Sequence, residues 1–396
     1  MRRLLLRFLP LLAASAGLLG GQVFVVVPFA NLSGGQNVDW IGESLSEAIR
    51  ETLVRSDVPV VSRDEREEMS RHLALKPFSQ PTKATSMRLA LALGAHRLLH
   101  GEFNVAWDSD SEAPSSGRLT VTARVIELDR MSQGPEWREE GAMTDLGRLQ
   151  RQLAWKMLQY AAPAKASSKA EFEKQYPATR LDAIESYIRG LLSASPEQKH
   201  RLFAQAVRLD PEFSQACYQI GLMLWEENRY RSAMEWLERV KPGDACYLEA
   251  GFLLGVSRFH AGDYEGALAA FDEVRKRLPV AMVFNNLGVV LFRMNDPGAV
   301  GYLRRAAEEE PEAADYQFNL GYVLWRQGEI DAAAEFLGAA VEIDPLDSEA
   351  ADLLERCRNQ SSPRRGDLSS GGLERLNDNL GEIVYRRRTF AARSSP

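Results

Sequence analysis

The stretch LEAGFLLGVSRFHAGDYEGALAAFDEVRKRLP, residues 248–279, decides the fold of most of this 396-residue chain. Gly255 and Ala267 are small residues twelve positions apart, and the large apolar Phe271 follows four positions later. Pro279 then closes the stretch. This order predicts two antiparallel helices, because the small residues let the helices approach and the large residue fills the gap to the next pair.

The same pattern recurs along the chain with a period near 34 residues, which indicates a stack of such helix pairs. The glycines are Gly190, Gly221, Gly255, Gly288 and Gly321; the alanines are Ala233, Ala267 and Ala333; the large residues are Leu237, Phe271 and Leu337; the closing prolines are Pro211, Pro279, Pro311 and Pro345. The first unit is short, and the fourth places Ala299 one residue early, beside Pro297. The sequence therefore does not decide the turns of these two units, whereas it does predict their helix pairs.

Residues 180–358 resemble the tetratricopeptide repeat (TPR) family, as five units and a capping helix from Ser348 to Cys357. The resemblance implies an all-α solenoid in which the first helix of each unit lines a concave groove. Counted from the glycine as position eight, positions five, nine and twelve then face inward. They are Tyr218, Leu222 and Trp225; Phe252, Val256 and Phe259; Asn285, Val289 and Phe292; and Phe318, Tyr322 and Trp325, with His260, Arg293 and Arg326 beside them.

These aromatic rings predict a groove that binds a protein or peptide partner, because rings give a large contact area with few rotatable bonds. Two alternatives stay open: the tail or the first domain fills the groove, or some of the rings belong to the solenoid core. The asparagine and lysine set of a carboxylate clamp is incomplete. We expect no catalytic residues, no cofactor and no metal site here.

Residues 23–160 predict a separate α/β domain, a mixed sheet with helices. Apolar or alternating runs indicate strands over residues 23–29, 58–61, 96–107, 118–129 and 135–143. Helices are predicted between the first and second strands, after a cap at Asp39, between the second and third strands, and after the last. Ser62 and Glu65 form a predicted capping box at one helix start. Small and charged residues over 161–179 predict a linker.

The motifs VVVPFANLSGGQNVDWIGESLSEAI, VPVVSRDE, ALGAHRLLHGEF and RLTVTARVIEL of this domain resemble the TolB amino-terminal and CsgG-like family. Pro28, Phe29 and Asn31 fit the first motif of that family. The resemblance implies a non-catalytic domain that contacts an envelope component. A membrane pore is not expected, because the turn DSDSEAPSSG is short and acidic.

No motif of the chain predicts catalysis. The loop NLSGGQNV lacks the lysine of a phosphate loop, so its glycines are expected to form a turn, with anion binding at Ser33–Gly35 as the alternative. His96 and His100 have no third ligand arranged around them. Cys217, Cys246 and Cys357 predict buried thiols, although a Cys217–Cys246 bridge stays open. The net charge of −7 gives no general attraction to nucleic acid.

The two ends of the sequence carry the remaining predictions. Residues 1–22 have a basic start and a short apolar run, typical of a cleaved signal peptide. We therefore expect a periplasmic or secreted scaffold with no membrane span once the leader is removed. The alternative is an uncleaved anchor on an intracellular regulatory scaffold. Residues 359–396 predict a flexible basic tail, although LERLNDNLGEIVYRRRTF is a candidate for folding onto a partner.

Overall fold

The computed structural model describes residues 22–33, 38–75, 82–107, 117–176, 179–361 and 373–394. The chain divides into two compact units, each of which we describe by itself. The first comprises Met1–Ile220, Pro242–Ala245 and Arg387–Pro396, and the second comprises Gly221–Lys241 and Cys246–Arg386. Helices make up most of the described ranges, and none of these helices is long and apolar enough to cross a bilayer.

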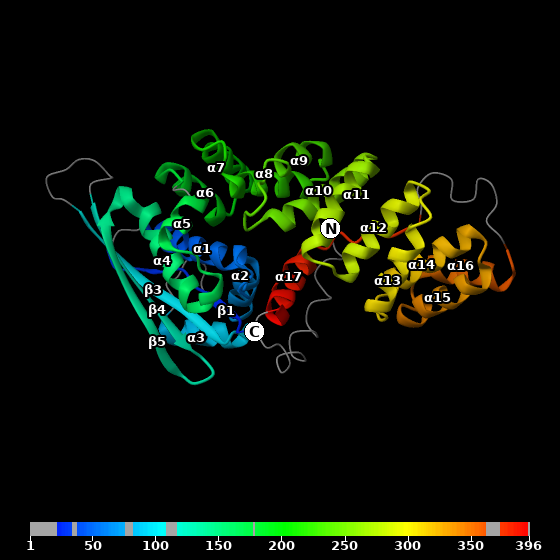
Figure 1. Ribbon diagram of the computed structural model, residues 1–396, viewed down its shortest axis with the longest axis horizontal. Coiled ribbons are helices and arrows are strands. Elements are labelled where there is room, and N and C mark those ends of the chain that lie inside the picture. Colours follow the sequence, from blue (N-terminus) through cyan, green and yellow to red (C-terminus); the bar gives the residue numbers. More distant parts are fainter. Residues whose placement is uncertain are drawn as a thin grey trace. The chain divides into compact units, whose positions relative to one another are not determined.

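The first unit contains a mixed sheet, as predicted for this region (Figure 1). The strands are β1 (Phe24–Val26), β2 (Ala30–Asn31), β3 (Arg97–Trp107), β4 (Gly117–Glu127) and β5 (Ser132–Ala142). β1 and β2 both pair in parallel with β3, whereas β3, β4 and β5 form an antiparallel meander. β5 therefore forms one edge of the sheet.

Side chains on both faces of the central strand β3 are buried. Leu98 and Leu99 are neighbours and so point to opposite faces, yet both are fully buried. Leu98 lies opposite Ile126 on β4, and Leu99 lies opposite Val125. The edge strand β5 instead alternates between exposed and half-buried positions. The core of this unit thus lies around β1, β3 and β4.

Two strand predictions are corrected by the structure. Of the strand expected over residues 23–29, only Phe24–Val26 forms a strand, and the short β2 follows the predicted range; between them the N–H of Phe29 donates to the carbonyl of Gly42 in the following helix. The strand expected over residues 58–61 is only a single bridge between Phe24 and Val60. It stops there because Ser62 already caps the next helix.

Four helices accompany the sheet in this unit: α1 (Trp40–Arg55), α2 (Arg63–His72), α3 (Lys83–Ala92) and α4 (Leu146–Ala161). The predicted capping box of α2 is confirmed. The Ser62 hydroxyl accepts the N–H of Glu65 at 3.2 Å, and the Ser62 N–H donates to the Glu65 carboxylate at 2.9 Å. Helix α4 buries Leu149, Leu153 and Met157, which recur at helical spacing.

The motif around Asn31 holds the chain between β2 and α1. Asn31 Nδ2 donates to Asp39 Oδ1 at 2.6 Å, and Asn31 Oδ1 accepts the N–H of Ser33 at 2.8 Å. Helix α1 approaches so closely that a Cβ on Gly42 would lie 2.1 Å from the carbonyl oxygen of Phe29. Residues 34–37, where the predicted turn and its alternative anion site fall, lie outside the described residues.

The region predicted as a linker, residues 161–179, contains ordered structure in its described part. Helix α5 (Lys169–Gln175) begins with a capping box between Ser168 and Glu171. Its Phe172 is buried, with its ring centroid 4.6 Å from that of Tyr176. This segment is therefore held to the first unit by an apolar side chain.

Helix pairs follow in the order that the repeat pattern predicts (Figure 1). They are α6 (Leu181–Leu192) with α7 (Pro196–Leu209), α8 (Ser214–Glu226) with α9 (Tyr230–Leu237), α10 (Tyr247–Ala261) with α11 (Tyr264–Arg277), α12 (Ala281–Arg293) with α13 (Ala299–Glu309), and α14 (Ala314–Gln327) with α15 (Ile330–Ile343), followed by α16 (Ser348–Arg358). The first pair belongs to the first unit, and the pairs from α10 onward belong to the second.

The glycines of the repeats lie where two helices of a pair touch. A Cβ on Gly321 would lie 2.7 Å from a Leu337 side-chain carbon, so only glycine leaves room for that side chain. In the fourth pair Gly288 contacts Leu303 in the same way, although Leu303 follows one residue early. Ala299 is shifted with it and is buried. The turn is one residue shorter, and the packing of the pair is retained.

The described tail residues form a stretch without helix, strand or turn, 373–379, followed by α17 (Leu380–Ser394). The sequence predicts a flexible tail, whereas this described part of it includes a helix. Residues up to Arg386 are grouped with the second unit, and those from Arg387 onward with the first. In the first unit Arg388 pairs with Glu65 at 2.8 Å, and Arg387 donates to the carbonyl of Ala245.

Candidate functional site

The second unit holds a segment of its own chain against the first helices of its repeats. We call residues 373–379 the tail segment. Its contacts come from α12, α14 and α16, of which α12 and α14 are the first helices of their pairs. The TPR resemblance assigns these first helices to the concave face. The candidate site is therefore the surface of α12, α14 and α16 that contacts the tail segment.

Two asparagines bind the backbone of the tail segment, each with its side-chain nitrogen as donor and its side-chain oxygen as acceptor. Asn319 Nδ2 donates to the carbonyl of Arg375 at 2.8 Å, and Asn319 Oδ1 accepts the N–H of the same residue at 2.7 Å. Asn286 makes the equivalent pair with Asn377, at 2.8 Å for each bond. Residues two apart in an extended chain present their backbone groups on the same side, so this spacing fits an extended peptide.

A third asparagine links these two. Asn285 Nδ2 donates to the carbonyl of Arg375 at 3.0 Å, and its Oδ1 accepts from Asn319 Nδ2 at 2.7 Å. Asn285, Asn286 and Asn319 are all fully buried. Buried amides need hydrogen-bond partners, and the tail backbone supplies them here. The three side chains thus form one connected network across α12 and α14.

The side chain of Arg375 enters a pocket of acidic and aromatic groups. Its guanidinium makes a two-point contact with the Asp347 carboxylate, at 2.6 and 2.9 Å. It also donates to Asp315 at 2.9 Å, and its carbon lies 3.7 Å from the centroid of the Phe318 ring. Burial acts to raise the pKa of Asp347, but the hydrogen bonds from Arg375 outweigh it and lower the pKa below its usual value.

The neighbouring tail residues are also held by charge and by hydrogen bonds. The Glu374 carboxylate is fully buried and pairs with Arg293. Asn377 Nδ2 donates to the hydroxyl of Tyr316 at 3.0 Å. Burial, and then the nearby Glu382 and Glu310 carboxylates, raise the pKa of that Tyr316 hydroxyl. Acidic, basic and amide side chains of the segment thus each meet a complementary group.

The first turns of α17 continue this contact. Arg386 pairs with Glu310 at 2.7 Å, and Ile383 is fully buried. Burial raises the pKa of Glu310, and the Arg386 charge offsets only part of that effect. The tail segment is therefore held by the asparagines and by the groups around Arg375, and the start of α17 after it is held as well.

Several predicted groove residues take part in this site. Asn285, Arg293 and Phe318 contact the tail segment directly. Trp325 is fully buried, and its Nε1 donates to the carbonyl of Ser361 at 2.8 Å, near the start of the tail. Tyr322 is fully buried as well, between the rings of the other predicted residues Phe292, Phe318 and Trp325.

Other predicted residues lie elsewhere. Phe252 is fully buried and packs edge-on against Phe271, so it belongs to the packing of its own helix pair. Val256 and Val289 are fully buried. Tyr218, Leu222, Trp225 and Phe259 are half-buried, whereas His260 and Arg326 are exposed. His260 stacks on Tyr230 at 4.5 Å, and Arg326 donates to the Tyr322 hydroxyl at 3.1 Å.

Four residues of this site are not predicted by the sequence: Asn286, Asn319, Asp315 and Asp347. Asn286 and Asn319 both stand two residues before a repeat glycine, at position six of successive units. A polar amide at the same position of two units is a signal for this site, but the TPR resemblance implies only positions five, nine and twelve as inward. Asp347 is the residue before α16 and also accepts the N–H of Ala350, so it reads locally as a helix cap.

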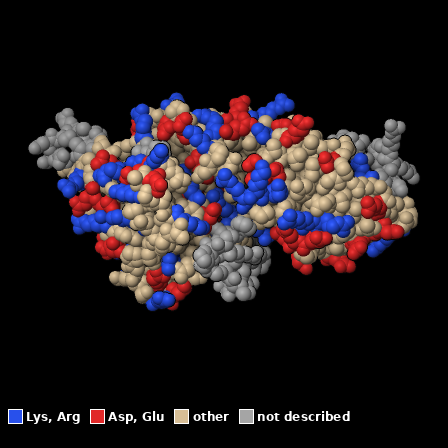
Figure 2. Space-filling model, viewed as in Figure 1, with Lys and Arg blue, Asp and Glu red and all other residues tan. Residues whose placement is uncertain are grey.

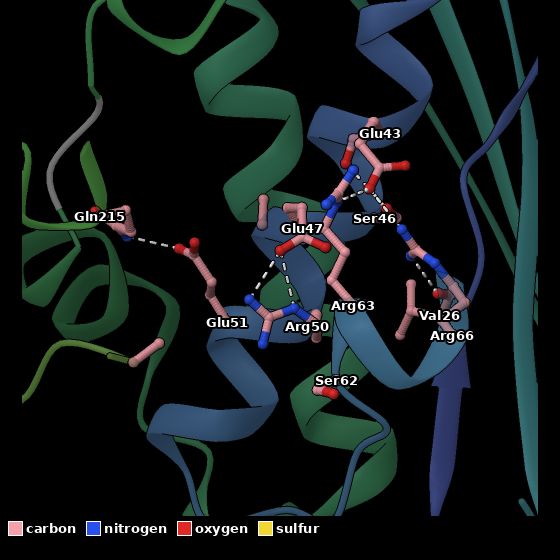
Figure 3. A network of polar contacts seen from close by, with 12 residues as sticks. Val26, Glu43, Ser46, Glu47, Arg50, Glu51, Ser62, Arg63, Arg66 and Gln215 are labelled. Carbon is pink, nitrogen blue, oxygen red and sulfur yellow. Dashed lines mark hydrogen bonds and ion pairs between the residues drawn. The ribbon is translucent and has the colours of Figure 1, made fainter. Parts of the chain in front are cut away.

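The first unit contains a buried ion network of a different kind (Figure 3). Glu43 accepts from both Arg63 and Arg66, and Arg66 also donates to the carbonyl of Val26 at 3.0 Å. Burial acts to raise the pKa of the neighbouring Glu47, but Arg50, Arg66 and Arg63 outweigh it and lower the pKa. Each charge faces an opposite charge or a backbone carbonyl. The network joins α1, α2 and β1 and has the character of a structural core.

The described residues show no cluster suited to metal binding. No group of three or more His, Cys, Asp or Glu side chains in these ranges is arranged to hold an ion. All three cysteines are described, and none of them is in a disulfide bond. On the face shown in Figure 2, acidic and basic side chains are interspersed over the surface.

Comparisons with known proteins identify the repeats. The tetratricopeptide repeat family matches residues 214–241, 252–298 and 297–348. The BBSome complex member BBS4 of Bos taurus is 25% identical over 166 residues, which is 41% of this chain and 32% of that protein. The match thus spans about a third of the relative's length.

Similar solved structures include those of YrrB, MamA and PilF. YrrB, a TPR protein with an unusual peptide-binding site, is 20% identical with a TM-score of 0.35, over 47% of this chain and 90% of that one. MamA of Desulfovibrio magneticus RS-1 is 21% identical with a TM-score of 0.38, over 43% and 99%. PilF of Pseudomonas aeruginosa is 18% identical with a TM-score of 0.37, over 54% and 92%. These likenesses are too low for any function to be transferred.

The family match covers the helices that hold the tail segment, α12 and α14, together with α8, α10 and their partners. Repeats of this kind generally serve as scaffolds for protein interactions. Residues 214–241 and 252–348 of this chain are tetratricopeptide repeats.

Proposed function

We propose that this protein is a non-catalytic scaffold of the bacterial cell envelope, and that its repeats bind an extended segment of a partner polypeptide. The partner occupies the surface where α12, α14 and α16 contact the tail segment. The N-terminal α/β domain docks to an envelope component, as its resemblance to TolB amino-terminal and CsgG-like domains implies. No bond is made or broken at either place.

One observation carries the proposal: Asn286 and Asn319 each bind the N–H and the carbonyl of one backbone residue. Such contacts depend on an extended backbone rather than on any single side chain. Main-chain bonds of this kind supply affinity in other modes of peptide recognition, while side-chain pockets supply selectivity. A second peptide of the same conformation would find the same bonds.

The envelope location rests on the composition of residues 1–22 and on the resemblance of the α/β domain. Mass spectrometry of the mature amino terminus tests it. Cleavage near Ala16 or Gly21 would support export, whereas an intact Met1 would support the alternative, an intracellular scaffold tethered by its leader.

Partner binding is tested with a photo-crosslinking residue placed in the living cell at Phe292 or at Phe336. Both phenylalanines are half-buried, but Phe292 is on the first helix of its pair and Phe336 on the second. We expect a crosslinked partner from position 292 and none from position 336. The crosslink should weaken strongly in an Asn286→Ala, Asn319→Ala double variant.

The matched control is Asn359→Ala, which removes an exposed amide after α16. This variant should crosslink as well as the wild-type chain. Equal crosslinking from positions 292 and 336, or a crosslink that survives loss of both buried asparagines, would contradict binding at this site.

A further inference from the structure

The site that is proposed to bind a partner is already occupied by residues of the same chain. Besides the backbone bonds, it makes contacts that depend on which side chains the occupant carries. These contacts indicate both what the partner looks like and how access to the site is controlled. The inference rests on the proposed function, because it names the ligand of that same site.

The pocket around Arg375 is selective for arginine. Asp347 faces the guanidinium with both carboxylate oxygens, and Asp315 approaches the same group from another side. Glu349 adds a longer contact at 3.3 Å, and the Phe318 ring lies against the cationic plane. A planar, forked cation satisfies a two-point carboxylate contact and an aromatic face together, whereas the compact ammonium of lysine does not.

The position before the arginine is selective for an acid. The Glu374 carboxylate is fully buried against Arg293, and the Arg293 guanidinium carbon lies 6.0 Å from the centroid of the Phe259 ring. A buried carboxylate is costly unless a cation faces it. A neutral or basic residue at this position would leave Arg293 without its charge partner on the ligand.

The position two residues after the arginine, that of Asn377, is selective for an amide or a similar polar group. Asn377 bonds to Tyr316 with its side chain while Asn286 holds its backbone. Its Nδ2 also donates to Glu382 at 3.3 Å, and its Oδ1 accepts the N–H of Asn379 at 3.0 Å. The occupant therefore presents an acid, then an arginine, and an asparagine two positions after the arginine.

We infer that Glu374–Asn377 is an internal ligand, and that the external partner is an extended peptide of the same Glu-Arg-x-Asn chemistry, which must displace it. Residues 362–372 connect the site to this ligand in the sequence. Because the ligand belongs to the same chain as the site, its binding is intramolecular, and an external peptide has to compete with it. The chain therefore resists weak partners and opens to one that binds more tightly or is locally abundant.

The test uses a fluorescein-labelled peptide, GGLERLNDNLGE, which copies residues 371–382. A second peptide carries Arg→Ala at the position of Arg375. Anisotropy titrations use the full wild-type chain, an Arg375→Ala chain and an Arg358→Ala chain. Arg358 is an exposed arginine of α16 and serves as the matched control.

We expect the Arg375→Ala chain to bind the arginine peptide at least about tenfold more tightly than the wild-type chain, because its internal ligand has lost its anchor. The alanine peptide should bind that opened chain about tenfold more weakly than the arginine peptide. The Arg358→Ala chain should behave like the wild type. Adding Asp347→Asn to the opened chain should reduce the difference between the two peptides, because the two-point contact is lost while Asp315 and the Phe318 ring remain.

Each other outcome has a separate meaning. Equal, tight binding of both peptides to the opened chain would leave the backbone site intact and overturn its selectivity for arginine. Binding of neither peptide would overturn the proposed peptide site itself. Equal binding of the arginine peptide by the wild-type and opened chains would show that the internal ligand does not compete.

Two accompanying measurements keep the test decisive. Circular dichroism must show the same helix content for all variants; if Arg375→Ala loses helix, Arg375→Lys, which keeps the charge and loses the fork, takes its place with a smaller gain in affinity. Sedimentation should show a monomer. A dimer that dissociates on adding the arginine peptide would assign the occupant to a second copy and overturn an internal ligand.

Discussion

The guanidinium carbon of Arg375 lies 3.7 Å from the centroid of the Phe318 ring, while the carboxylate of Asp347 binds the same guanidinium at two points. Arg375 follows Phe318 by 57 positions in the sequence, and only folding of the tail onto α14 brings them together. The pair links the part of the chain that the repeat pattern predicts to the part that it does not.

Replacing Phe318 with Leu should release the tail segment more often. A cation over an aromatic face contributes about 0.5–2 kcal/mol, and leucine retains most of the apolar volume without that face. Because trypsin cleaves after arginine, the rate of cleavage after Arg375 in the native state reports this release. We expect that rate to rise several-fold.

The control for this change is Phe336→Leu on α15. Phe336 also faces an arginine, Arg304, at 5.7 Å, but it lies outside the site. Cleavage after Arg375 should keep its wild-type rate in this variant. An unchanged rate of cleavage after Arg375 in Phe318→Leu would show that the Phe318 ring does not help to hold Arg375.

Because of the Asp347–Arg375 pair, the free energy of unfolding should fall as the pH becomes acidic. The pKa of Asp347 is lowered in the folded chain from an ordinary value of 3.8. A lowered carboxyl pKa stabilises the folded state fully above the unfolded value, and the effect is lost as pH falls through the folded value. Urea unfolding of wild type and Asp347→Asn should therefore differ most above about pH 4 and converge below it. A difference that stays constant down to pH 3 would contradict the pairing.

Gly255→Ala should destabilise the second unit. An added Cβ would lie 2.7 Å from a Phe271 ring carbon, and overpacking of this kind costs about 1–3 kcal/mol. Gly338→Ala is the matched control, because Gly338 lies inside α15 with no atom within 4 Å of the added Cβ. That change should stabilise the helix by about 0.5–1 kcal/mol. Thermal unfolding of both variants measures the contrast, and equal effects would contradict the packing role of the repeat glycines.

Glu43→Gln should destabilise the first unit by about 3 kcal/mol, because two buried arginines lose the charge that they share. Glu140→Gln removes a carboxylate from an exposed pair with Arg118 and should leave the unfolding midpoint nearly unchanged. Urea unfolding followed by circular dichroism compares the two. A Glu43→Gln chain as stable as Glu140→Gln would show that the network in Figure 3 is not structural.

The helix pairs could be predicted because their packing repeats the same small and large residues. Gly288 and Ala299 show how far the pattern reaches: the spacing changes by one residue and the contact with Leu303 persists. The strand predicted over residues 58–61 is wrong because an apolar run does not show how many of its residues pair with a neighbouring strand, and here Val60 alone forms a bridge. Ser62 starts the next helix and leaves room for a single bridge.

The occupant of the site could not be predicted in the same way. The tail is polar and has no apolar period, so it lacks the signal that identifies a buried segment. It is held instead by amides and charges, among them Asn286, Asn319 and Asp347, which are individually ordinary on a helical surface. Only their meeting in three dimensions distinguishes them.

The most direct measurement of the central claim is amide hydrogen exchange at Arg375 and Asn377 in the full chain. The account predicts that both N–H groups exchange slowly in the wild type, because Asn319 and Asn286 accept them. In an Asn286→Ala, Asn319→Ala chain, both should exchange at close to the rate of an unstructured peptide. Fast exchange at both residues in the wild-type chain would show that the repeats do not hold this backbone, and would contradict the account.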